Sequence, residues 1–91
     1  MACYVYMLRC KDNSIYTGWT TDLSRRLNQH NAGVASKCTA SRRPVELVYS
    51  EELPDRPTAL RREYAIKQLS RPDKLRLIAG AASGSAQHPG V

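Results

Sequence analysis

Two short stretches near the start of the chain, joined by four polar residues, constrain the fold more than any other feature of the sequence. Residues 3–10 read CYVYMLRC and residues 15–19 read IYTGW, and both are rich in the side chains that favour strands. The KDNS between them, at 11–14, has the Asp-Asn chemistry of a tight turn. The sequence therefore predicts a β-hairpin at the start of the chain.

A helix is predicted directly after the hairpin. Leu23 and Leu27 lie four positions apart and form the inward stripe of a helix over about residues 21–31. Thr20 or Thr21 is the expected N-cap. A helix with this stripe is expected to pack its leucines on the sheet.

A long polar connection and a third strand come next. Residues 32–44 are small and polar and are expected to form a loop, and a loop of this length in a small domain is usually functional or mobile. Residues 45–50 read VELVYS, and their alternation predicts a strand.

The second half of the chain predicts two helices. Asp55 or Thr58 caps the first, which runs over about residues 57–69, and a shorter helix follows over the DKLRLIA of residues 73–79. The residues expected to face inward in part are Leu60, Tyr64, Ile66 and Leu69. From Gly80 onward the composition is that of a disordered terminus.

The order strand, strand, helix, strand, helix, helix predicts an α+β fold, a small three-stranded antiparallel sheet flanked by helices. A chain of 91 residues has room for one modest core. We expect one domain over residues 1–79 and a tail over residues 80–91.

Charge and cysteine usage limit the class of protein. The 14 Lys+Arg against 8 Asp+Glu give a net charge of +6, which favours an acidic partner such as nucleic acid, with general solubility as the plain alternative. Three cysteines without C-x-x-C spacing indicate neither a disulfide framework nor a zinc site. Neither a signal peptide nor a membrane-spanning run is apparent, so we expect a soluble cytoplasmic protein without membrane contact.

Five polar residues stand out, although each has an ordinary explanation. Tyr6 and Tyr16 suit the core of a chain without Phe, and Arg26 suits a solvated helix face. His30 lies four positions after Arg26, near a helix C-terminus where an imidazolium is favourable. Glu63 can form an ion pair with the lysine four residues later. No one of these residues indicates chemistry by itself.

Taken together and in order, these residues resemble the GIY-YIG nuclease superfamily. The YVY at 4–6 and the YTG at 16–18 resemble the two short motifs that name it, and the motif tyrosines are separated as in that pattern. Arg26 in the following helix, His30 one turn later and Glu63 in a later helix continue the match. Five residues in order at matching spacing are a far more specific signal than any one tripeptide.

The resemblance covers residues 3–78 and is greatest to the small, stand-alone, single-domain members, whose biological role is poorly defined. Tyr4 replaces the glycine of the first motif and Thr17 the isoleucine of the second, and neither position is expected to do chemistry. Trp19 stands where many members have lysine, and Leu75 where many have asparagine.

The resemblance implies a metal-dependent nuclease in which each of the five residues has a role. Glu63 would hold one Mg²⁺ or Mn²⁺ ion. Arg26 would bind a phosphate oxygen through its planar fork. Tyr16 would orient or deprotonate the attacking water, assisted by Tyr6. His30, whose unperturbed pKa is near 6.5, would receive a tyrosine proton.

A shared site for both tyrosines makes a geometric demand on the hairpin. Side chains alternate faces along a strand, so a turn of even length places Tyr6 and Tyr16 on opposite faces. We therefore predict a loop of odd length or a β-bulge near Gly18.

The remaining candidates are residues for nucleic-acid binding. Lys37, Arg42 and Arg43 in the long loop are expected to contact the DNA backbone, with Arg25 beside the site. Trp19 either stacks on an exposed base or caps the core.

The sequence is compatible with three functions. The first is a divalent-metal-dependent DNA endonuclease that is structure-selective or weakly sequence-selective, acting on branched or damaged DNA. The second is a non-catalytic nucleic-acid-binding module on the same fold. The third is a protein that works only with a partner that supplies specificity.

Overall fold

A computed structural model describes residues 2–87 of the chain. Its elements, in chain order, are β1 (Cys3–Arg9), β2 (Ile15–Thr20), α1 (Leu23–Asn31), α2 (Lys37–Ala40), β3 (Glu46–Leu53), α3 (Arg56–Lys67) and α4 (Arg71–Gln87). The predicted α+β class and the order of the predicted elements are confirmed. The short helix α2 is an addition, because it forms inside the segment expected to be a loop.

The sheet has the strand order β2-β1-β3, and both of its pairs are antiparallel, so β1 is the central strand. The β1–β2 ladder ends at the pair Arg9 and Ile15, so residues 10–14, an odd number, form the turn. Asn13 takes the left-handed conformation in this turn, with φ of 68°.

The sheet does contain a β-bulge, but it lies on the other side of the central strand. Met7 pairs with Tyr49 and Leu8 with Leu47, which leaves Val48 as the extra residue of β3. The β1–β2 ladder is regular through Gly18. The odd loop alone therefore meets the demand that the two tyrosines share a face.

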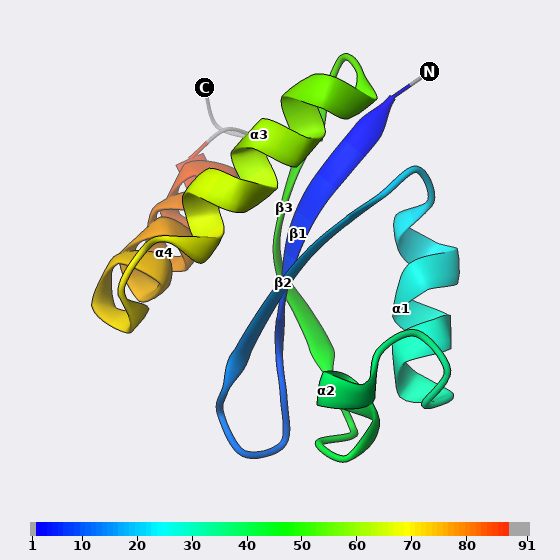
Figure 1. Ribbon diagram of the computed structural model, residues 1–91. Coiled ribbons are helices and arrows are strands. Elements are labelled where there is room, and N and C mark those ends of the chain that lie inside the picture. Colours follow the sequence, from blue (N-terminus) through cyan, green and yellow to red (C-terminus); the bar gives the residue numbers. More distant parts are fainter. Residues whose placement is uncertain (1, 88–91) are drawn as a thin grey trace.

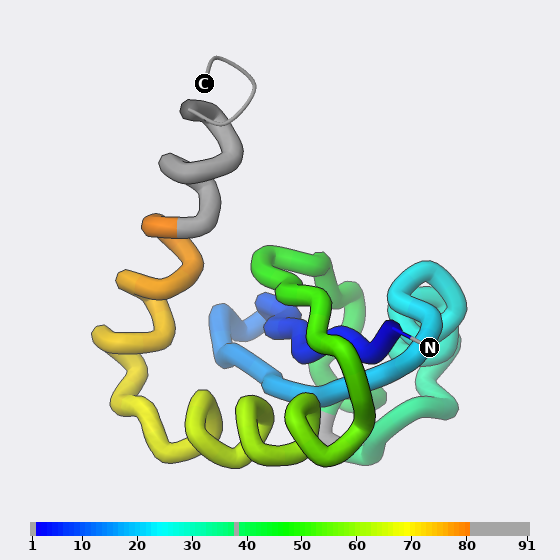
Figure 2. Tube along the Cα trace, turned by 90° about the horizontal axis from the view of Figure 1, so that it is seen from above, coloured from blue at the N-terminus to red at the C-terminus, as the bar shows by residue number. Residues whose placement is uncertain are grey.

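Helices cover both faces of the sheet (Figure 1). On one face α1 and α2 lie over a cluster that contains Tyr6, Leu8 and Val45, with Leu23 and Leu27 packed against it as expected. On the other face α3 and α4 cover a second cluster, built on Cys3, Val5, Met7, Ala59 and Ile66. Figure 2, seen from above, shows α3 along one side of the sheet, and α1 and α4 at opposite ends.

Helices α1 and α3 each have an aspartate as N-cap residue. The Asp22 side chain accepts a hydrogen bond from the backbone N–H of Arg25 at 3.0 Å, so the predicted cap at Thr20 or Thr21 is wrong. The Thr20 hydroxyl instead accepts from the N–H of Asp22 and braces the turn before the helix. Asp55 caps α3 by accepting from the N–H of Thr58, which confirms one of the two expected caps.

The inward face of α3 differs from the expected one. Ala59 and Ile66 are buried, whereas Leu60 is 39% and Tyr64 68% exposed, so the inward placement of those two was wrong. Residues four and seven positions apart share a helix face, and counting from Ala59 these positions are Glu63 and Ile66. A carboxylate therefore occupies a position on the sheet-facing side of α3.

Helix α4 extends beyond the predicted end at residue 79. The segment from Gly80, which was expected to be disordered, is helical as far as Gln87, and residues 88–91 of the expected tail lie outside the described residues. Within residues 2–87, every helix is too short or too polar to cross a lipid bilayer.

Candidate active site

The two motif tyrosines lie on the same face of the hairpin. Leu8 pairs with Tyr16 across the ladder, and Tyr6 is two residues before Leu8, so all three side chains point to the α1 side. The Tyr6 and Tyr16 ring centroids are 6.5 Å apart. The predicted turn of odd length is confirmed, and with it the shared face.

Gly18 makes room for the Tyr6 ring. The two residues pair across the ladder, and a Cβ atom at residue 18 would lie 2.6 Å from Tyr6 Oη and 3.2 Å from Tyr16 Cε2. Real Cβ atoms do not approach other heavy atoms this closely, so a side chain here would displace the tyrosine. The Tyr6 ring thus packs directly against the backbone of Gly18, the kind of close approach that a glycine inside a strand often marks.

His30 enters the site from the last turn of α1 and hydrogen bonds through both ring nitrogens. Its Nε2 lies 2.8 Å from the Tyr6 hydroxyl, and its Nδ1 lies 2.7 Å from the Thr39 hydroxyl. The Thr39 hydroxyl also lies 3.3 Å from the Ser36 carbonyl, to which it can donate. Tyr6, His30 and Thr39 are 2%, 1% and 0% exposed, so bulk water has little access to this hydrogen-bonded chain.

The three rings of the site pack edge to face. The His30 ring lies 5.8 Å from the Tyr6 ring and 5.1 Å from the Tyr16 ring, centroid to centroid, at steep interplanar angles. His30 thus touches both tyrosines, but its hydrogen bond is to Tyr6. His30 was expected to receive a proton from a tyrosine, and the tyrosine hydroxyl to which the structure joins it is that of Tyr6.

Arg26 lies one turn before His30 on the same face of α1, with a half-buried side chain. Its guanidinium lies close enough to the Tyr6 hydroxyl to act on it electrostatically, and its Nη1 donates to Gln29 Oε1 at 3.3 Å. Its Nε is buried and has no hydrogen-bond partner among the residues described. An unpartnered donor beside a tyrosine hydroxyl suits a phosphate oxygen brought by a ligand.

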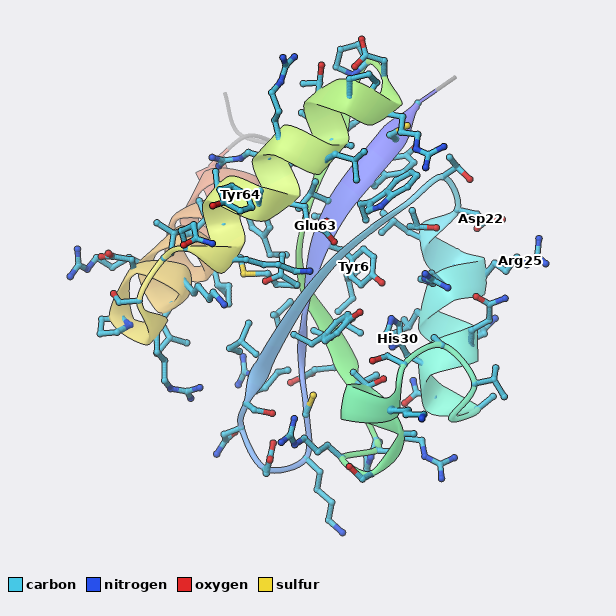
Figure 3. All side chains as sticks on the ribbon, viewed as in Figure 1. Tyr6, Asp22, Arg25, His30, Glu63 and Tyr64 are labelled. Carbon is cyan, nitrogen blue, oxygen red and sulfur yellow. The ribbon has the colours of Figure 1, made fainter. Side chains whose placement is uncertain are left out.

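Glu63 approaches the site from the opposite helix layer. Figure 3 shows Tyr6 lying between Glu63 of α3 and His30 of α1, and the negative charge of Glu63 acts on the Tyr6 hydroxyl. The Glu63 side chain is 17% exposed, and its Oε2 lies 3.5 Å from Nζ of Lys67, four residues later. The ordinary ion pair expected for Glu63 is therefore present, together with its proximity to the tyrosine.

Burial sets the protonation states of the central pair. Desolvation is the main cause that raises the pKa of Tyr6 to about 12, and the nearby Arg26 guanidinium only partly opposes it. Desolvation, helped by the positive charge of Arg26, lowers the pKa of His30 below its usual value. At neutral pH, Tyr6 therefore keeps its proton and His30 is an uncharged acceptor.

The carboxylate of Glu63 fits a hard divalent cation that completes its coordination from elsewhere. Within residues 2–87 no cluster of three or more His, Cys, Asp or Glu side chains forms a ready metal cage. Mg²⁺ is commonly held by one or two carboxylates together with waters and substrate phosphates. Lys67 now neutralises this carboxylate, so a cation would compete with the lysine.

Two of the predicted DNA-contacting arginines already have partners within the protein. Arg42 forms an ion pair with Asp12 at 3.1 Å. Arg43 donates to the carbonyls of Ala40 at 2.8 Å and Asn31 at 3.4 Å. Both side chains brace the segment around α2, which is a structural role that the sequence did not indicate.

The other predicted nucleic-acid contacts differ in how free they are. Lys37 and Arg25 are exposed, and Arg25 points away from the sheet (Figure 3). Trp19 packs against the cluster under α3, and the Arg56 guanidinium lies 5.4 Å from its ring centroid. The core-capping alternative therefore describes the position of Trp19 in this structure.

Sequence reasoning missed Thr39. It lies in a segment read as a loop, in a SKCTAS context that matches no short motif, and nothing in its spacing links it to the residues before it. Only the fold of residues 32–44 back over α1 brings its hydroxyl to His30.

Comparison with known proteins places the chain in a family. Residues 2–76 match the GIY-YIG catalytic domain. A UPF0213 protein of Staphylococcus haemolyticus is 53% identical over 75 residues, which are 82% of this chain and 92% of that protein. A UPF0213 protein of Natronomonas pharaonis is 49% identical over 76 residues, 84% of this chain and 89% of the relative.

Two solution structures share the fold. The UPF0213 protein of Bacillus halodurans has a TM-score of 0.57 at 46% identity, over 87% of this chain and 84% of that one. A protein of E. faecalis has a TM-score of 0.62 at 38% identity, over 90% and 88%. With tyrosine, arginine, histidine and glutamate gathered around one point of the sheet, the chain belongs to the GIY-YIG family of nuclease domains, in the branch of the small UPF0213 proteins.

Proposed function

We propose that this protein is a divalent-metal-dependent DNA endonuclease that hydrolyses phosphodiester bonds, with structure selectivity or weak sequence selectivity. GIY-YIG domains are nuclease domains that generally use divalent metal ions and act on nucleic acid. The observation that carries the proposal is the buried hydrogen bond between Tyr6 and His30, flanked by Arg26 on one side and Glu63 on the other.

Arg26 is the proposed anchor for the scissile phosphate. Its buried, unpartnered Nε and its contact with the Tyr6 hydroxyl bring a phosphoryl oxygen next to the tyrosine. A planar guanidinium binds such an oxygen by directed hydrogen bonds and stabilises the charge that develops on it. The phosphate is thus held where a water near Tyr6 or Tyr16 can attack it.

In the proposed reaction Tyr6 relays a proton from the attacking water to His30 without forming a stable phenolate. A free phenolate is unfavourable at this site because burial raises the Tyr6 pKa to about 12. When the water oxygen bonds to phosphorus, one water proton passes to Tyr6 Oη while the Tyr6 proton passes to His30 Nε2. Tyr6 is neutral before and after, and His30 becomes an imidazolium. The bond to the leaving oxygen breaks, and that oxygen takes a proton from solvent. Tyr16, in contact with the His30 ring, helps to orient the water.

Glu63 is the proposed metal ligand, with Mg²⁺ or Mn²⁺ as the ion. Bound at Glu63, such a cation would neutralise the charge that develops on the phosphoryl and leaving oxygens. Glu63 would hold it through one carboxylate, which is largely buried but, at 17% exposure of its side chain, still accessible to an ion.

Recognition rests on charge and shape. The exposed Lys37 and Arg25, with Arg42 and Arg43 braced beside them, offer contacts to the DNA backbone without reading bases. Branched or damaged DNA is the proposed substrate, and a protein partner that supplies further specificity fits a chain with so little surface beyond the site.

The test is cleavage of labelled branched, flapped, single-stranded and duplex DNA with Mg²⁺, with Mn²⁺ and with EDTA. Glu63→Gln and Tyr6→Phe are compared with Glu52→Gln, which changes an exposed carboxylate of β3. We expect metal-dependent cutting that the first two substitutions abolish, with DNA binding retained and Glu52→Gln active. Cutting that survives Glu63→Gln or EDTA contradicts the proposal.

One observation favours the alternative of a nucleic-acid-binding module. Glu63 would repel a phosphate backbone, but Lys67 at 3.5 Å neutralises it without any metal ion. With Glu63 neutralised by Lys67, a module that only binds nucleic acid needs no metal ion at this position. If no DNA in the panel is cut and wild-type binding shows a steep salt dependence, the alternative replaces the nuclease proposal.

A further inference from the structure

The hydroxyl of Thr39 completes the polar chain that begins at Tyr6. Thr39 Oγ1 lies 2.7 Å from His30 Nδ1 and 3.3 Å from the Ser36 carbonyl oxygen. Thr39 is 0% exposed, so water does not substitute for either contact. Its position in α2 connects the segment before β3 to the centre of the site.

The direction of each hydrogen bond follows from the two ends of this chain. At one end the positively charged Arg26 guanidinium lies near the Tyr6 oxygen, so the oxygen lone pairs face this charge and the Tyr6 proton can point at His30 Nε2. At the other end the Ser36 carbonyl, which also accepts from the N–H of Ala40, lies within reach of the Thr39 hydroxyl, so Thr39 can donate to it while accepting from His30 Nδ1. With these directions, both ends are satisfied by a histidine that carries its proton on Nδ1.

We propose that Thr39 is a positioning residue that holds His30 in the Nδ1–H tautomer, so that Nε2 remains the acceptor of the Tyr6 proton. The other tautomer places a proton on Nε2, which then donates to the Tyr6 oxygen and cannot accept from it. The role resembles that of a buried group that orients a catalytic histidine in hydrolases, although Thr39 carries no charge.

If the protein cleaves DNA as proposed above, Thr39 would also help catalysis by stabilising the protonated His30. When His30 takes up the Tyr6 proton, its ring becomes positive and the Nδ1–H bond to Thr39 strengthens. The charged and titratable groups around the ring are Tyr6 on β1, Tyr16 on β2 and Arg26 on α1. The neighbour on α2, Thr39, is uncharged and does not titrate, so its removal changes proton placement without changing the charge of the site.

The first measurement is the tautomer itself, by long-range ¹H–¹⁵N NMR spectra of the labelled wild-type protein without DNA. The chain has two histidines, so the spectrum is simple, and His30→Gln assigns the signals. We expect a protonated Nδ1 and an unprotonated Nε2 at neutral pH. A wild-type His30 with its proton on Nε2 overturns the proposal, whether or not the protein cleaves DNA.

The second measurement compares Thr39→Val, which keeps the shape, with Thr39→Ser, which keeps the hydroxyl. We expect the valine variant to lose the pure Nδ1–H tautomer and to show a kcat about 10- to 100-fold lower with KM unchanged, a partial loss of the roughly 10²- to 10⁴-fold that positioned proton transfer contributes. The serine variant should keep the Nδ1–H tautomer and a kcat close to that of the wild type. An unchanged tautomer in a folded Thr39→Val protein overturns the proposal. If the tautomer shifts as expected but no DNA is cut by the wild type, the proposed function alone fails.

Discussion

The hydroxyl of Tyr6 lies 2.8 Å from Nε2 of His30, although the residues are 24 positions apart and come from a strand and a helix. Each side chain satisfies a buried polar atom of the other, so neither is explained by core packing alone. The pair therefore serves the stability of the fold and the proposed chemistry at once.

The Tyr6→Phe substitution should separate the two consequences of this pair. It keeps the ring but leaves the His30 Nε2 acceptor buried and unpaired, which costs about 1–3 kcal/mol of unfolding free energy. Cleavage should be lost by a larger factor than this destabilisation explains. Tyr4→Phe is the matched control, because Tyr4 lies two residues earlier on the same face and is only half-buried. Urea denaturation and initial cleavage rates measure the two effects. Equal behaviour of the two variants would contradict the assignment.

Gly18→Ala tests the close approach of the second motif to Tyr6. The new methyl group would lie 2.6 Å from Tyr6 Oη, so the ring must move and its bond to His30 must lengthen or break. We expect a loss of about 1–3 kcal/mol, typical of overpacking, and reduced cleavage.

Gly80→Ala is the control for the preceding substitution. Nothing lies within 4 Å of a Cβ atom at this position, and the residue lies within α4. It should be neutral or stabilising by up to about 1 kcal/mol, as expected for alanine replacing glycine in a helix. Thermal unfolding of both variants measures the contrast, and a Gly18→Ala protein as stable as the wild type would show that Tyr6 has room to move.

The hairpin and the first helix were predictable because their signals are local. The turn residues at 11–14 and the spacing of Leu23 and Leu27 sufficed for their placement. The shared face of Tyr6 and Tyr16 was also predictable, since strand alternation leaves few ways to satisfy it.

Other features depend on contacts that no local pattern encodes. Thr39 reaches His30 only because the chain between α1 and β3 folds back over the helix. The outward position of Tyr64 is set by the sheet-facing stripe of Ala59 and Ile66, and apolar residues on several sides of α3 left that stripe ambiguous in the sequence. The inward position of Glu63 follows from the same stripe.

His30 should titrate below its ordinary range. Its pKa is lowered by desolvation and by Arg26, so the folded protein binds this proton less readily than the unfolded chain, whose value is near 6.5. Unfolding free energy should therefore be fully present above about pH 6.5 and should fall as the pH decreases through the folded pKa. The proposed relay needs neutral His30, so kcat/KM should fall over the same acidic range. NMR titration of the His30 ring, with Tyr6, Tyr16 and Arg26 intact around it, gives the midpoint directly. A midpoint above 6.5 would contradict the prediction.

Lys67→Gln should strengthen binding of a divalent cation at Glu63. In the free protein Nζ of Lys67 lies 3.5 Å from the carboxylate, so an incoming cation must displace a positive charge that is already there. Because the lysine side chain is 49% exposed, water screens the pair, and its removal should tighten Mn²⁺ binding by only about two- to fivefold. Isothermal titration with Mn²⁺ in the absence of DNA measures the change independently of cleavage.

Lys74→Gln removes a positive charge from α4 and is the matched control, since no ion pair joins Lys74 to the carboxylates of the described residues. Glu63→Gln should abolish the binding in both backgrounds. If Lys67→Gln and Lys74→Gln bind Mn²⁺ equally well, the cation does not compete with Lys67 and Glu63 is not its ligand.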